Sequence, residues 1–150
     1  MYKRILVAVD GSASSAQGLA TAVELAKAFE ARLRLVHVIE GLAYLSGYDQ
    51  LGGAGNLAAA LQDAGAEVLR KDLAAVHSHG VEADTMLFDK LGEHLGETIA
   101  TAAKLWGADL VVTGTHGSKG LHRLLMGSGA EQIVRLAPVP VMVVRAEVRD

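Results

Sequence analysis

The sequence predicts an α/β fold, an open twisted sheet of five parallel strands with helices on both of its faces. Short runs of branched apolar residues alternate along the chain with longer segments in which apolar residues recur at helical spacing. Most of the short runs are apolar throughout, which is typical of strands that are covered on both sides. Parallel strands joined by right-handed helical crossovers account for both observations.

Five segments are predicted to be strands because they are rich in Val, Ile and Leu and are bounded by Gly, Pro or charged residues. Pro138 precedes the last of them and Pro140 lies inside it, which favours a place at the edge of the sheet. The predicted strands are Arg4 to Val9, Leu33 to Ile39, Ala83 to Phe88, Asp109 to Gly114 and Val139 to Val144.

Four segments between these strands have the spacing of amphipathic helices. Ser14 and Gln17 match a capping box near the start of the first. The glycine-rich stretch from Glu40 to Gly55, before the second helix, is predicted to be a loop. The apolar stripes are Leu19, Ala22, Val23 and Ala26 in the first helix, Leu57, Leu61, Ala64 and Val68 in the second, Ile99, Ala102, Ala103 and Trp106 in the third, and Ala130, Ile133, Val134 and Ala137 in the fourth.

Composition excludes several classes of protein. The net charge of −3 is spread along the chain, so no electrostatic surface for nucleic acid or an anionic membrane stands out. No apolar run approaches the ~20 residues that cross a bilayer, and the run after Met1 is too short for a secretory signal. The absence of Cys excludes disulfides and thiolate sites and agrees with a reducing compartment. We expect one cytoplasmic domain over residues 1–150.

A glycine-rich motif follows the fourth predicted strand. That strand ends in Gly114, Gly117 lies three residues on, and the fourth helix opens with Gly127, Ser128 and Gly129. Glycine lets bare backbone approach a sugar or phosphate, and the unpaired N–H groups of a helix start favour an anion. Ser128 also begins a capping box with the glutamate three residues later, so capping and phosphate binding both stay open for it.

The spacing of glycine, two residues, glycine, nine residues, glycine and serine matches the nucleotide signature of ATP-binding universal stress proteins, and the chain resembles this family. Nearly the whole chain takes part, with residues 42–92 matching least well. The resemblance implies a Rossmann-like sheet with strand order 3-2-1-4-5 and a regulatory role in the stress response. It also rests on the segments Val9 to Ser12, His37 to Ile39, Ala108 to Val112 and Pro138 to Val144.

The resemblance implies a bound adenine nucleotide, ATP or AMP. Asp10 would lie near the ribose and Val38 against the adenine, while the motif contacts ribose and phosphates. Asp10 has chemistry suited to ribose hydroxyls or to Mg²⁺, and capping of the first helix is the alternative role. The chain departs from the family at two places: it has Gly92-Glu93-His94-Leu95-Gly96 where the family often has a Gly-x-Pro turn, and Gly129 is smaller than the residue common at its position. The implied binding residues are Ala8, Asp10, Val38, Gly114, Thr115, His116, Gly117, Gly127, Ser128 and Gly129.

Other candidate functional sites have less support in the sequence. The chain has no P-loop, no dinucleotide glycine motif after the first strand and no nucleophile constellation, and a phospho-receiver would need more than the single Asp10. His77 and His79 point apart on a helix, so exposure is favoured over a shared metal. His116 and His122 lie in the nucleotide loop, where Lys119 and Arg123 either neutralise phosphates or are solvated. Trp106 is predicted to be core.

Two functions stay open at this point. The first is a nucleotide-binding regulator. The second is an enzyme, a weak metal-dependent ATPase or phosphotransferase that uses the same site, and we expect any hydrolysis to be slow. A homodimer through Val139 to Val144 is predicted, since an apolar edge strand favours pairing with a second copy, and relatives use this strand in that way. The alternative is a monomer whose edge is protected by prolines and charges.

Overall fold

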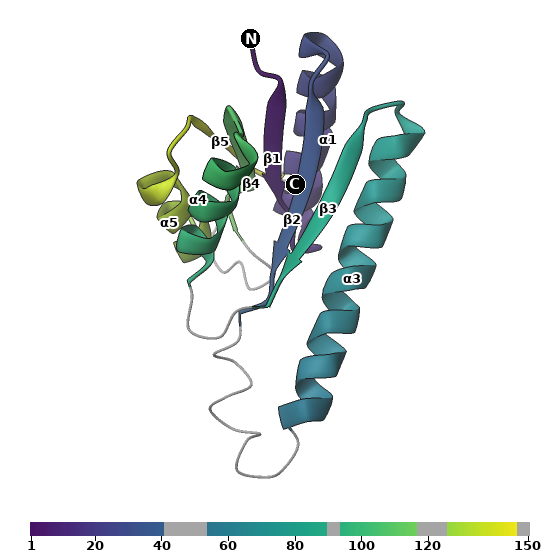
Figure 1. Cartoon of the computed structure of the whole chain (residues 1–150), viewed down its shortest axis with the longest axis vertical. Helices are drawn as coiled ribbons and strands as arrows, with labels where there is room; N and C mark the ends of the chain where they lie inside the picture. Colours follow the sequence, from purple (N-terminus) through teal and green to yellow (C-terminus); the bar gives the residue numbers. More distant parts are fainter. Residues whose placement is uncertain (41–53, 90–93, 117–125, 147–150) are drawn as a thin grey trace, which may run out of the picture.

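The computed structural model describes residues 1–40, 54–89, 94–116 and 126–146, of which 54–56 are described by their backbone alone. Strands and helices alternate along these segments (Figure 1). The elements are β1 (Arg4–Ala8), α1 (Ala13–Phe29), β2 (Arg32–Val38), α3 (Ala54–Ser78), β3 (Ala83–Phe88), α4 (Leu95–Trp106), β4 (Leu110–Gly114), α5 (Ser128–Leu136) and β5 (Val141–Val144).

The strands form one parallel sheet in the order β3-β2-β1-β4-β5, as predicted. Strand β1 lies at its centre, where Ile5 pairs with Leu33 of β2 and with Leu110 of β4. The chain moves outward in one direction after β1 and in the other after β4. The carboxyl ends of these two neighbouring strands therefore diverge into separate loops, which is where open α/β sheets bind ligands.

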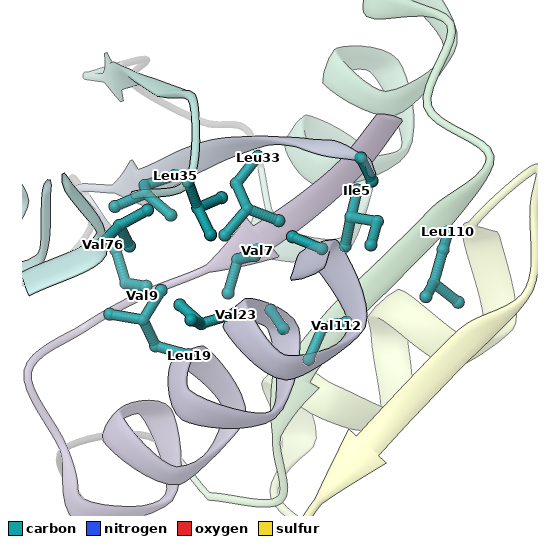
Figure 2. Packing of buried hydrophobic residues seen from close by; sticks show 14 of the residues in the cluster. Ile5, Val7, Val9, Leu19, Val23, Leu33, Leu35, Val76, Leu110 and Val112 are labelled. Carbon is teal, nitrogen blue, oxygen red and sulfur yellow. The ribbon is translucent and has the colours of Figure 1, made fainter. Parts of the chain in front are cut away.

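Two hydrophobic clusters cover the two faces of the sheet and explain why the central strands are apolar throughout. Alternate residues of β1 belong to different clusters, Ile5 and Val7 to one and Leu6 to the other. Helices α1 and α3 complete the first cluster, and Figure 2 shows Leu19, Val23 and Val76 packed against the strands. Helices α4 and α5 complete the second, through residues that include Ile99 and Ile133.

The start of α1 differs from the predicted capping box. Ser12 is the N-cap, and its Oγ accepts a hydrogen bond from the N–H of Ser15 at 3.2 Å. Ser14 is buried inside the first turn and bonds elsewhere. The prediction of Ser14 and Gln17 as the capping pair is therefore wrong by two positions, because several serines in a row all suit the cap and only tertiary contacts select one.

Strand β5 is two residues shorter than predicted. The prolines account for this, because they have no N–H to donate to a neighbouring strand. Pro140 still contributes its carbonyl, which accepts from the N–H of Val111 at 3.0 Å. The predicted position of β5 at the edge of the sheet is confirmed.

Glycines let α4 and α5 approach each other closely. A methyl group added at Gly96 would lie 2.5 Å from Gln132 Cβ, and one added at Gly129 would lie 2.6 Å from a Leu95 methyl. Gly129, at which the chain departs from the family pattern, thus lies in this helix contact. Most predicted apolar stripes face the core, but Ala64 and Val134 are exposed.

Trp106, at the end of α4, is half-buried and packs against the second cluster, in agreement with its predicted core position. Its ring also faces the Arg34 guanidinium, 4.7 Å away. Arg34 in turn makes two 2.8 Å hydrogen bonds to the carboxylate of Asp84 on β3.

Within the described segments, no helix combines the length and hydropathy needed to cross a bilayer.

Candidate functional site

The candidate site lies where β1 and β4 end side by side. Residues Asp10 to Ser12 form the turn that leaves β1, and Thr115 and His116 leave β4. Ala8 and Val38 are half-buried next to them in the strands and pack toward the α4 face. The structure thus brings together, at the carboxyl ends of the central strands, most of the residues that the sequence predicts for the site.

The turn after β1 is held by hydrogen bonds within and around it. The Asp10 N–H donates to Ser15 Oγ at 3.1 Å, and Asp10 Oδ1 accepts from the Ser12 N–H at 2.8 Å. Gly11 between them has φ +81, a left-handed conformation that favours glycine. Asp10 therefore shapes the turn rather than capping α1. The residue is half-buried just beyond the carboxyl end of β1.

The first residues after β4 are tied to α1. Ser14 Oγ donates to the carbonyl of His116 at 2.5 Å and lies 3.3 Å from its N–H, and Ser12 Oγ also donates to that carbonyl at 3.3 Å. On the other side, the Thr115 N–H donates to the carbonyl of Val144 in β5 at 2.9 Å. The backbone of the motif is thus fixed between the N-terminus of α1 and the edge strand.

Gly114 has a structural reason to be glycine that the sequence did not indicate. A Cβ at this position would lie 2.5 Å from Ser14 Oγ and 2.7 Å from the backbone carbon of Ser14. The sequence favoured an approach to ligand, whereas the observed neighbour of Gly114 is helix α1. Gly117, His122, Lys119 and Arg123 lie outside the described residues.

Among the described residues, one ring nitrogen of His116 has a hydrogen-bond partner and the other has none. Its Nδ1 lies 3.1 Å from Thr115 Oγ1, a buried hydroxyl. Its Nε2 is buried, with no hydrogen-bond partner in the described part of the chain. Buried polar atoms normally have partners, so this nitrogen is available to a group outside the described residues, such as a bound ligand.

Helix α5 begins next to the end of β4. Gly127 is its N-cap, and the Gly127 N–H donates to the carbonyl of Thr115 at 2.6 Å, which joins the helix start to the end of β4. The cap makes no side-chain hydrogen bond, and Ser128 is an exposed first residue of the helix. The capping-box alternative for Ser128 and Glu131 is therefore wrong, and Glu131 pairs with Arg135 instead.

Negative charge gathers on the α3 side of the site. Burial, together with the charge of Asp10, raises the pKa of Asp72 on α3, while Lys71 and His37 lower it by a smaller amount. Within residues 1–40, 54–89, 94–116 and 126–146, no group of three acidic or histidine side chains is arranged to hold a metal. His77 and His79 are exposed, as predicted.

The sequence missed Ser12, Ser14 and His37 as parts of the site. Ser14 stood out only as a predicted helix cap, and Ser12 and His37 only as members of segments that resemble the family. No local pattern reveals that Ser14 contacts a residue 102 positions away.

The sequence profile of the Universal stress protein family matches residues 1–145. The chain belongs to this family. A universal stress protein of Methanocaldococcus jannaschii is 32% identical over 145 residues, which cover 97% of this chain and 83% of that one. YxiE of Bacillus subtilis is 31% identical over 97% of this chain and all of its own. The solved structure of UspA from Lactobacillus plantarum superposes with a TM-score of 0.82 at 27% identity, covering 96% and 98% of the two chains.

Three more distant universal stress proteins share the fold and were solved with adenine nucleotides. One from Archaeoglobus fulgidus holds dAMP (TM-score 0.67, 22% identity, 95% of this chain and 98% of that one). One from Arabidopsis thaliana holds AMP (TM-score 0.70, 20% identity, 97% of this chain and 93% of that one). A third is in complex with cAMP (TM-score 0.64, 22% identity, 97% of this chain and 98% of that one).

Proposed function

We propose that this universal stress protein binds an adenine nucleotide, ATP or AMP, between the carboxyl ends of β1 and β4, and acts in the cytoplasm as a regulator of the stress response. The observation that carries the proposal is the buried Nε2 of His116, which has no hydrogen-bond partner among the residues that the structure describes. It lies in the loop between β4 and α5, at the switch in strand order where such folds take ligands.

The two tautomers of His116 match two parts of a nucleotide. When Nδ1 accepts from Thr115 Oγ1, the neutral ring carries its proton on Nε2 and donates to a phosphate oxygen. When Nδ1 donates instead, Nε2 accepts from a ribose hydroxyl or the adenine amino group. Both are groups of an adenine nucleotide, and relatives of this fold hold AMP, dAMP and cAMP.

The proposed contacts follow the order of the elements. Asp10 accepts from ribose hydroxyls, Val38 packs against adenine, and the free N–H groups at the start of α5 bind phosphate. Mg²⁺ is commonly held by one or two carboxylates together with nucleotide phosphates, so Asp10 fits a metal that arrives with ATP. The proposed binding residues are Ala8, Asp10, Val38, Gly114, Thr115, His116, Gly117, Gly127, Ser128 and Gly129.

Calorimetry with ATP and AMP, with and without Mg²⁺, tests the proposal. We expect dissociation constants in the roughly micromolar range. His116→Phe should weaken binding, while His79→Phe, a change at an exposed histidine far along the chain, should leave it unchanged. The proposal would be refuted if millimolar nucleotide produced no heat of binding and no shift in melting temperature. Release of phosphate beyond one event per site, abolished by Asp10→Asn, would instead favour the slow ATPase.

We further propose a homodimer through the β5 edge, which spans Val141–Val144 in the structure. All four residues of this strand are only half-buried in the single chain. The carbonyl of Val144 accepts from the Thr115 N–H, so a partner on β5 would lie one hydrogen bond away from the nucleotide motif. Sedimentation decides the matter, since a single-chain mass at tens of micromolar protein excludes the dimer.

A further inference from the structure

The peptide group that joins Val9 to Asp10 is fixed by two side chains from different elements. The carbonyl of Val9 lies 2.7 Å from His37 Nδ1, and the N–H of Asp10 lies 3.1 Å from Ser15 Oγ. A carbonyl only accepts, so His37 Nδ1 carries the proton and donates. Both polar atoms of one peptide are thus held just where β1 ends and the proposed site begins.

His37 is held in place by a notch in α3. The helix has glycine at position 65, and a Cβ there would lie 2.7 Å from His37 Cδ2 and 3.2 Å from its Nε2. It would also lie 2.9 Å from Leu87 Cδ1, the far end of a flexible side chain that can move aside. The Cδ2–Nε2 edge of the ring therefore lies against bare helix backbone, while the Nδ1 edge faces β1. A longer side chain at Gly65 would push the ring out of this position.

The orientation of this peptide determines the direction in which Asp10 leaves the strand. Asp10 then bonds to the Ser12 N–H, and Ser12 in turn caps α1 and reaches the carbonyl of His116. Val68 of α3 lies near the same turn, since a Cβ added at Gly11 would be 3.4 Å from Val68 Cγ2. Helix α3 is therefore connected to the ribose side of the proposed site through His37 and this turn.

We propose that His37 is a positioning residue for nucleotide binding: its Nδ1–H, held by the notch at Gly65, orients the Val9–Asp10 peptide and with it the Asp10 carboxylate. This rests on the proposed nucleotide site. The imidazole itself touches no ligand. Its effect on affinity is transmitted through one hydrogen bond to the backbone of β1.

Two substitutions at His37 separate the hydrogen bond from the packing. His37→Asn keeps an N–H donor at nearly the place of Nδ1 and loses the rest of the ring. His37→Phe keeps the ring and loses the donor. We expect ATP to bind the Asn variant like the wild type and the Phe variant about fivefold more weakly, the effect of one net hydrogen bond. A purely structural role would give the opposite order, because packing is lost only in His37→Asn.

A change on α3 tests the same connection from the other side. Gly65→Ala should weaken ATP binding about as much as His37→Phe, although alanine is the better helix former. Combining Gly65→Ala with His37→Asn should restore affinity, because the shorter side chain has no Cδ2 to collide. His79→Asn is the matched control at an exposed histidine.

Binding is measured by calorimetry well below the melting temperature of each variant. Backbone amide shifts of Asp10, Gly11 and Ser12 are recorded without ligand by NMR. We expect these amides to move in His37→Phe and stay in place in His37→Asn. Wild-type affinity in His37→Phe, or unmoved amides, overturns the inference. If even the wild type fails to bind nucleotide, the proposed function fails and takes the binding role with it, while the amide shifts separately decide whether His37 positions the turn.

Discussion

Gly114→Ala tests whether the first glycine of the nucleotide motif serves the fold or the ligand. The added methyl group would lie 2.5 Å from Ser14 Oγ, 2.7 Å from Ser14 C and 2.9 Å from Ser14 Cβ. Ser14 is buried, and its C and Cβ atoms are fixed by the backbone of α1, so the strand or the helix must move. Overpacking of this kind costs about 1–3 kcal/mol.

For a domain of this size, 1 kcal/mol shifts the melting temperature by roughly 2–4 °C, so a loss of about 2 kcal/mol predicts a decrease of about 4–8 °C. The assay is thermal and urea unfolding without nucleotide. Gly18→Ala is the matched control, since Gly18 faces the same strand from α1 and its Cβ would be 3.6 Å from Gly114 N, an ordinary contact. We expect no loss of stability there, because alanine favours the helix.

The outcome for ligand binding separates the two explanations of Gly114. A ligand-free variant that melts within about 1 °C of wild type but binds nucleotide poorly would refute the packing argument. Such a result would restore the interpretation in which Gly114 makes room for a sugar or phosphate. A destabilised variant that still binds nucleotide when folded would confirm that this glycine accommodates α1.

Three further results are expected. Ser128→Ala should change stability by less than about 0.5 kcal/mol, because Ser128 makes no cap bond, so any loss of nucleotide affinity in calorimetry reports phosphate binding. Asp84→Asn removes an ion pair in which Arg34 lowers the pKa of Asp84. The pair stabilises the fold above the unfolded pKa of about 4, and the difference between the variant and wild type should vanish as pH falls through the lowered folded pKa. Because the Asp84 side chain is 57% exposed, melting curves at pH 7 should differ by no more than about 1 kcal/mol. Met142→Asp should convert a sedimenting dimer to single chains, and a dimer that persists would place the interface elsewhere.

The accuracy of the sequence-based predictions depended on how local each signal was. The strands were found within two residues, because an apolar run covered on both sides leaves a continuous pattern. The start of the first helix was predicted less accurately, because Ser12, Ser14 and Ser15 are all suited to the N-cap position. Only packing decided that Ser12 caps α1, that Ser14 reaches His116, and that Ser15 holds the N–H of Asp10.

The sequence by itself determined the class of fold, and it predicted a ligand site at the carboxyl ends of the strands and a close approach of backbone at glycines such as Gly114. These follow from apolar periodicity and from the short range over which a missing side chain acts. The tertiary structure decided what each glycine approaches. Gly114 faces Ser14, and Gly65 faces His37, because the crossing of helices over the sheet brings together residues that are far apart along the chain. No local pattern encodes such a contact, since it depends on the placement of a whole helix on a face of the sheet.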